Sequence, residues 1–219
     1  MPEDLRLMIY SERTVVCLTR MVEAAIMSGN DRNFRLKKRV TLNVAAIYLP
    51  TFSRPNDMGN FRAAADLLEK YNIGLRVWPP GGDKLSVNSL DFGPYDKPIP
   101  NTRAAYQQLR KDVNEWIGNR ATGYPFLVPI IFCQYDTRGA GITPHSTKIG
   151  AATPACLISM SASSMQDRMT VLHEMGHAAL YPKHRHDGTP GNLMQEADGR
   201  TYLLKYQVEA FGKAFFARY

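Results

Sequence analysis

The chain alternates between two spacings of apolar side chains. Residues 40–49 and 73–77 carry apolar side chains at every second position, which is typical of β-strands. Between them, residues 58–71 place Phe61 and Leu68 at helical spacing. Two strands joined by a helix usually pair in parallel through a right-handed crossover. The pattern therefore predicts a strand–helix–strand unit in the first half of the chain.

Further elements follow from the same periodicities. In chain order they are a helix over 12–28, a loop rich in Pro and Gly over 79–101, a helix after this loop, a buried strand over 126–133, a turn with extended chain over 139–144 and a last strand over 155–160. The helix after the loop has an apolar face made of Tyr106, Leu109, Val113, Trp116 and Ile117. Pro129 inside the buried strand indicates a bulge or an edge position.

The C-terminal third is predicted to be helical with one irregular interruption. Residues 163–166 match a capping box, so a helix is expected from there to about Leu180, where Pro182 helps to end it. Residues 181–200 are expected to be irregular, and a final helix is expected from about Tyr202. Together the elements predict an α/β fold, with helices packed on a mixed, mostly parallel sheet.

Composition narrows the protein class. With 219 residues and 44% hydrophobic content, the chain is expected to form one domain of ordinary size. No apolar run is long enough to cross a bilayer, and the N-terminus lacks a basic stretch followed by an apolar one. We therefore expect a cytoplasmic protein, or one that is exported without a cleavable signal peptide. The three widely spaced cysteines are not a disulfide framework and favour a reducing compartment.

The formal charge of +7 suggests anionic partners only weakly. The basic residues are dispersed, and their only tight run, over 35–39, adjoins a predicted strand. A solvated sheet edge is therefore favoured over a nucleic-acid-binding surface.

The segment 171–194 contains the most informative pattern. His173, Glu174 and His177 form the sequence H-E-x-x-H inside a predicted helix. Residues four apart share a helix face, so both imidazoles can bind one catalytic Zn²⁺ ion. Glu174 lies next to the first ligand, where it can act as general base toward a water molecule. Catalytic zinc normally has three protein ligands, so a third is expected downstream.

The residues after this motif resemble the metzincin clan of metallopeptidases, whose motif is H-E-x-x-H-x-x-G-x-x-H. The first five positions match, but Leu180 replaces the glycine and Lys183 stands at the third histidine's position. His184 comes one residue later, and Tyr181-Pro182 can supply a slightly longer turn. We therefore favour His184 as the third ligand. His186 is the alternative, because its spacing to the methionine discussed below fits the clan better; Asp187 is a weaker choice.

The resemblance extends to the end of the chain. The sequence GNLM at 191–194 is similar to the clan's methionine turn, which makes Met194 the corresponding methionine. Tyr202 and Tyr206 follow, and some zincins use such a tyrosine to stabilise the oxyanion, although a packing role is favoured for each. The resemblance implies one zincin-like metallopeptidase domain over 1–219. Its N-terminal subdomain (1–183) would hold the sheet and the active-site helix, and its small C-terminal helical subdomain would span 184–219.

The function that follows is that of a zinc-dependent metalloendopeptidase. Its partner would be a protein or peptide substrate, extended along an edge strand near residues 141–144. Two alternatives stay open: a non-catalytic zincin-like binding domain, which the intact Glu174 disfavours, and a nucleic-acid-associated protease, which only the charge supports. A chain of this size without a signal peptide is also compatible with a bacterial effector or toxin.

Overall fold

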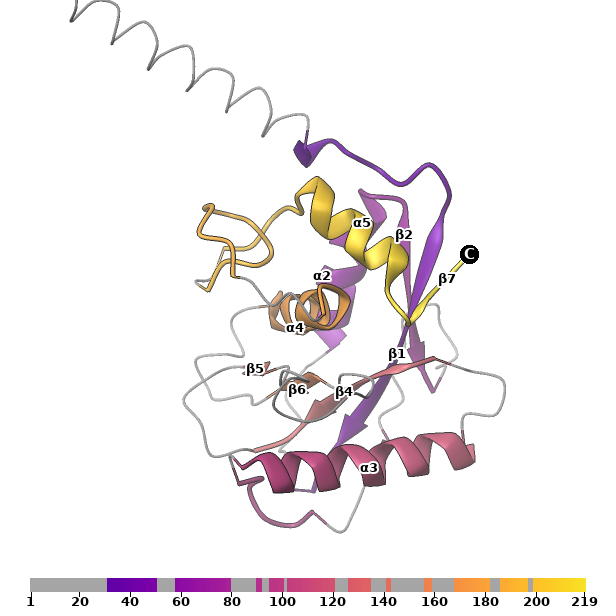
Figure 1. Cartoon of the computed structure of the whole chain (residues 1–219), viewed down its shortest axis with the longest axis vertical. Helices are drawn as coiled ribbons and strands as arrows, with labels where there is room; N and C mark the ends of the chain where they lie inside the picture. Colours follow the sequence, from indigo (N-terminus) through magenta and orange to yellow (C-terminus); the bar gives the residue numbers. More distant parts are fainter. Residues whose placement is uncertain are drawn as a thin grey trace, which may run out of the picture.

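The computed structural model describes residues 31–50, 58–79, 90–91, 95–100, 102–120, 126–134, 141–142, 156–158, 168–181, 186–196 and 199–219. Within these ranges the elements are β1 (Val40–Tyr48), α2 (Met58–Glu69), β2 (Ile73–Trp78), β3 (Leu90–Asp91), α3 (Arg103–Arg120), β4 (Val128–Phe132), β5 (Gly141–Ile142), β6 (Cys156–Ile158), α4 (Thr170–Ala179), α5 (Lys205–Lys213) and β7 (Ala217–Arg218). The chain is thus an α/β protein, as its periodicity predicts (Figure 1).

The strands form one sheet with the order β2-β1-β4-β6-β5. Strand β1 is parallel to β2, with Val40 opposite Ile73, and to β4, with Val44 opposite Val128. The predicted strand–helix–strand unit is therefore confirmed. Strand β4 is parallel to β6, and the short β5 is antiparallel to β6 at the end of the sheet.

Three details of the sheet differ from the sequence prediction. Pro129 does not mark an edge strand, because β4 lies between β1 and β6. Among the residues that the structure describes, β6 pairs with residues 130–132 of β4, and Pro129 pairs with Ala45 of β1. The predicted loop over 79–101 contains β3, which pairs with the end of β1. The sequence analysis predicts that the last strand lies over 155–160. The structure contains a later strand, β7, which pairs antiparallel with Thr41 and Leu42.

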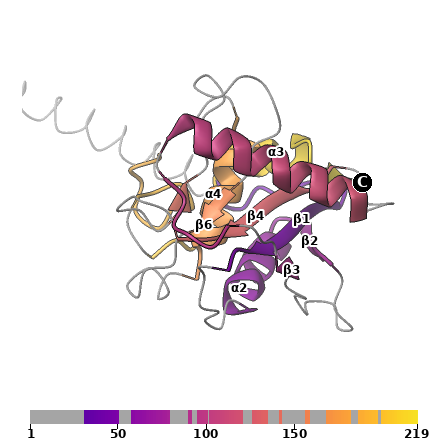
Figure 2. The same ribbon diagram turned by 90° about the horizontal axis from the view of Figure 1, so that it is seen from below.

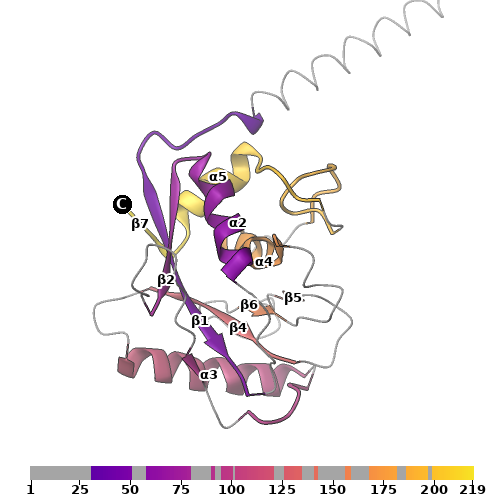
Figure 3. The ribbon, with the colours of Figure 1, turned by 180° about the vertical axis from the view of Figure 1, so that it is seen from behind.

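Helices cover both faces of the sheet. Figures 1 and 3 show α2, α4 and α5 on one face and α3 on the other, and Figure 2 shows α3 lying across the strands. Side chains of β1 alternate between two cores: Leu42 and Val44 belong to the core under α2, α4 and α5, whereas Ala45 and Ile47 belong to the core under α3. A strand buried on both faces needs apolar residues at nearly every position.

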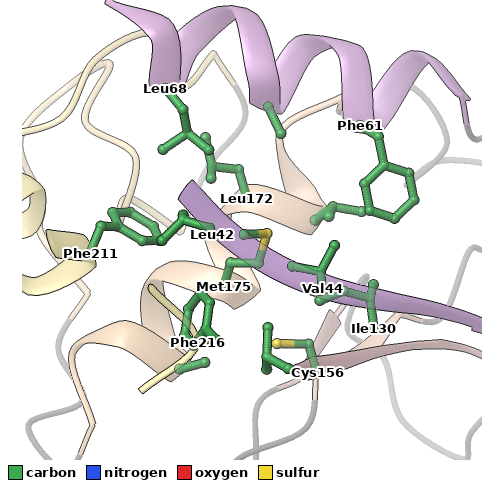
Figure 4. Packing of buried hydrophobic residues seen from close by; sticks show 14 of the residues in the cluster. Leu42, Val44, Phe61, Leu68, Ile130, Cys156, Leu172, Met175, Phe211 and Phe216 are labelled. Carbon is green, nitrogen blue, oxygen red and sulfur yellow. The ribbon is translucent and has the colours of Figure 1, made fainter. Parts of the chain in front are cut away.

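Helix α4 is buried on nearly all sides. Its residues Leu172 and Met175 point into the larger core, between α2 and β1 (Figure 4). The helix begins at Thr170 after the N-cap residue Met169, which is later than the capping-box pattern predicts. Residues 163–166, which carry the capping-box pattern, lie outside the described ranges, and residues 168–169 form a turn before α4. The end of α4, with Leu180 as its C-cap, agrees with the prediction.

The predicted helix over 12–28 and the favoured third ligand His184 fall outside the described residues. Helix α5 begins at Lys205, three residues after the predicted start at Tyr202. The final helix is thus present but shorter than expected. Among the residues that the structure describes, no helix combines the length and apolar character needed to cross a membrane.

Candidate metal centre

The centre is built on one side of α4. His173 and His177 are four residues apart, so they lie one above the other on the helix. The two imidazoles are 5% and 3% exposed, and Glu174 is 3% exposed. Ionisable side chains are rarely buried this completely unless they are paired or bind a ligand. Three of them on neighbouring positions of one helix therefore indicate a functional site.

The tautomer of His173 follows from its hydrogen bond. Its Nδ1 lies 2.8 Å from the carbonyl oxygen of Leu193. A carbonyl oxygen can only accept, so Nδ1 carries the proton and, in the neutral ring, Nε2 carries the lone pair. This Nε2 lies 3.1 Å from Nε2 of His177. Two nitrogen atoms that approach this closely share either a proton or a cation between them.

A third imidazole faces the pair. One ligand atom from each of His173, His177 and His186 lies within 4.8 Å of the others, so the three residues could hold a metal ion. The ring centroids of His186 and His177 are 4.9 Å apart, and those of His186 and His173 are 5.4 Å apart. His186 is more exposed than the other two, so it lies on the solvent side of the centre.

The loop that carries His186, residues 186–196, folds back against α4. The Asp187 amide donates to the carbonyl oxygen of Met194 at 2.9 Å, which brings the two ends of the loop together. Gly191 has a φ of +80°, a conformation that favours glycine. Asn192 accepts a hydrogen bond from the Met194 amide through its side-chain oxygen at 2.8 Å. The loop is thus shaped by its own polar groups.

A buried amide pair fixes this loop to α5. The Asn192 and Gln207 side chains are 0% and 1% exposed and exchange two hydrogen bonds of 3.1 and 2.7 Å. The oxygen of Gln207 also accepts the amide of Leu204 at the start of α5. Because a buried amide without its partner is costly, this pair holds the 186–196 loop in one position.

Met194 packs against α4 at Gly176, which lies between His173 and His177 in the sequence. A Cβ atom placed on Gly176 would lie only 2.5 Å from the sulfur of Met194, so the side chain packs directly against the helix backbone. Met194 is fully buried. The sequence analysis names Met194 as the clan's methionine by resemblance; the structure shows that it packs beside α4, and its role as that methionine stays a prediction.

The two candidate tyrosines are held by other groups. Tyr202 donates to the carbonyl oxygen of Pro190 at 3.2 Å and stacks under the guanidinium of Arg32. Tyr206 donates to Oδ2 of Asp187 at 3.1 Å and accepts from Gln207 at 3.0 Å. Tyr202 therefore supports the loop, whereas Tyr206 contacts the residue next to His186. An oxyanion role for either tyrosine stays a prediction.

Asp187 uses its carboxylate within the loop. Its Oδ1 accepts from the amide and hydroxyl of Thr189, and its Oδ2 accepts from Tyr206. Burial opposes ionisation of this carboxyl, but these hydrogen bonds outweigh the burial and lower its pKa. Asp187 thus acts as a loop-forming residue and is not part of the histidine cluster, whose described members are His173, His177 and His186.

The spacing of four residues predicts that His173 and His177 lie close together, and their Nε2 atoms are 3.1 Å apart. For the third ligand, the length of the turn after α4 favours His184 over His186. The favoured His184 lies outside the described residues, and the alternative His186 is the one in the cluster. Sequence reasoning also overlooked Gly176, whose position inside a helix was a signal, because glycine there costs about 1 kcal/mol relative to alanine. The Asn192–Gln207 pair and Glu196, which contacts His186, carry no local signal.

The arrangement can bind a cation through three nitrogen atoms, and the buried Glu174 directly follows the first of these residues in the sequence. Such a set can perform metal-assisted acid–base chemistry. No protein-family model matches the chain, and the comparison with curated proteins gives no match.

Proposed function

We propose that this protein is a zinc-dependent metallopeptidase, in which His173, His177 and His186 bind one zinc ion and Glu174 is the general base. The observation that carries the proposal is the buried pair of Nε2 atoms, 3.1 Å apart, with a third imidazole whose ligand atom lies within 4.8 Å of the other two. Glu174 follows the first of these residues on the same buried helix.

The donor set fits zinc. Two nitrogen ligands bound at about 2.05 Å with a tetrahedral angle are about 3.3 Å apart, close to the observed separation. Three neutral imidazoles suit Zn²⁺ better than Ca²⁺ or Mg²⁺, which prefer oxygen ligands. A set of three protein ligands also leaves a fourth tetrahedral position for water or substrate, which is typical of catalytic rather than structural zinc.

Zinc bound there would supply Lewis acidity, which polarises a carbonyl group and lowers the pKa of water. Glu174 would take a proton from the attacking water and deliver it to the amine that leaves when the peptide bond breaks.

We assign the third ligand to His186 rather than His184. The backbone hydrogen bond between Asp187 and Met194 supports this assignment, because it joins the two ends of the loop, and the ring of His186 lies 4.9 Å from that of His177. The length of the turn after α4 is the argument that favours His184. The spacing from the third histidine to Met194 favours His186, and the cluster geometry supports the same choice.

An extended substrate would lie along the sheet edge next to α4. Strand β5 is the terminal strand in the sheet order, and it is antiparallel to β6. The end strand of a sheet offers backbone groups that a peptide can pair with, and such pairing holds the peptide extended. This mode of binding suits an endopeptidase that binds several consecutive residues of an unfolded segment.

The test is proteomic. Wild-type protein and the Glu174→Gln variant are each incubated with a denatured proteome, and new N-termini are identified. We expect cleavage by the wild type that disappears on zinc chelation, and a loss of about two to four orders of magnitude in rate for the variant, with its zinc retained. Equal cleavage by both proteins would refute the role of Glu174. Zinc binding without any cleavage would instead indicate a binding domain.

A further inference from the structure

Glu196 contacts the most exposed member of the cluster. Its Oε1 lies 2.9 Å from Nδ1 of His186, and the two side chains are 78% and 41% exposed. A carboxylate oxygen accepts hydrogen bonds, so Nδ1 of His186 carries a proton in this contact. In the neutral ring, Nε2 is then the atom with the lone pair.

Nδ1 of His173 is protonated for the same reason, but its acceptor is a different oxygen. There the carbonyl oxygen of Leu193 holds the Nδ1 proton, and this oxygen belongs to the backbone of the 186–196 loop. One loop thus supplies the acceptor for two rings: a backbone carbonyl for the buried imidazole and the Glu196 carboxylate for the exposed one. The acceptor for the exposed His186 ring is thus a side chain and not the backbone of the loop.

The backbone that carries Glu196 is anchored. Arg200, which is 8% exposed, donates from Nε to the carbonyl oxygen of Gln195 at 3.0 Å and from Nη2 to that of Glu196 at 3.2 Å. Gln195 in turn accepts the amide of Gly191 through its side chain at 2.8 Å. The backbone of Glu196 is therefore held in place, although the side chain that carries the carboxylate is exposed.

We propose that Glu196 is a positioning residue that fixes the tautomer and the orientation of His186, so that Nε2 of His186 binds the metal. Carboxylates commonly orient metal-binding histidines in this way. An exposed ion pair contributes little to folding, so removal of Glu196 should change metal binding and not the fold. The proposal rests on the zinc site proposed above and adds the residue that determines the geometry of its third ligand.

The first experiment measures zinc affinity by competition with a chromophoric chelator. Glu196→Ala should bind zinc about 10- to 100-fold more weakly than wild type. Glu196→Gln should recover part of the loss, because its amide oxygen still accepts from Nδ1. Glu115→Ala is the matched control, since it removes the same charge from an exposed position on α3, across the sheet. It should bind zinc as the wild type does.

Two spectroscopic signatures separate positioning from a general weakening. The visible absorption of the cobalt-substituted protein should change in Glu196→Ala and stay unchanged in the control. Long-range ¹H–¹⁵N spectra of the metal-free protein, recorded where His186 is neutral, should show the Nδ1–H tautomer in wild type and a mixture in Glu196→Ala.

The outcomes are distinguishable. Zinc affinity, cobalt spectrum and tautomer that are all unchanged in Glu196→Ala would overturn the positioning role and leave the proposed function intact. A wild-type chain that binds no zinc would overturn both.

Discussion

At the scale of single residues, the site depends on which nitrogen of each imidazole is protonated. The Nδ1 atoms of His173 and His186 both lie at hydrogen-bond distance from an oxygen that can only accept. The sequence could predict the helical pair, because the spacing of four residues has only one geometric meaning on a helix. It could not predict the acceptors, because Leu193 and Glu196 come close only after the loop has folded.

The contact between Gly176 and Met194 gives a residue-scale prediction. Gly176→Ala should destabilise the protein by about 1–3 kcal/mol, because its new methyl group overlaps the Met194 sulfur. In a Met194→Ala background the overlap is gone, so the same change should be neutral or should stabilise by up to about 1 kcal/mol. Urea unfolding of the four proteins in the presence of a chelator measures the coupling.

Gly118 provides the control for this cycle. It lies on α3, and nothing is within 4 Å of the position that its Cβ would occupy, so Gly118→Ala should stabilise in both backgrounds. Equal effects of Gly176→Ala with and without Met194 would show that the two residues do not touch in solution.

At the scale of elements, the 186–196 loop is positioned by α5. The Asn192–Gln207 pair links them, and Asn192 also holds the amide of Met194. Gln207→Ala should therefore destabilise by about 1–3 kcal/mol, because it leaves a buried amide unsatisfied, and should weaken zinc binding by shifting the loop. Gln108→Ala, at an exposed position on α3, should do neither.

Urea unfolding with chelator present and zinc competition measure the two effects separately. A Gln207→Ala protein that is destabilised but binds zinc normally would show that α5 supports the fold and not the metal centre.

The elements that sequence periodicity predicts most clearly have several turns or several strand pairs. Strand β1 and helices α2 and α3 have one or two apolar faces that any correct fold must cover, so their patterns are unambiguous. Strands β3 and β7 contain two residues each and exist because β1 offers them open positions on its two sides. Such pairing is decided by the tertiary fold and leaves no local pattern.

At the scale of the whole molecule, three layers combine to place the centre. The sheet and α2 bury one side of α4 with Leu172 and Met175 (Figure 4). The 186–196 loop contacts α4 at His173 and Gly176. The net charge of +7 contributes little to this account. Within the basic run over 35–39, Arg39 makes two hydrogen bonds of 2.7 Å to Glu69, so this cation is paired within the chain.

The measurement that tests the account most directly is zinc content per chain, after dialysis against a weak chelator, for wild type and four histidine variants. We expect one zinc ion in the wild type, none in His173→Ala or His177→Ala, a large loss in His186→Ala and no loss in His184→Ala, the matched control from the same segment. Circular dichroism verifies that each variant is folded. Full zinc in both helical variants would contradict the site itself, and loss in His184→Ala with retention in His186→Ala would contradict the assigned third ligand.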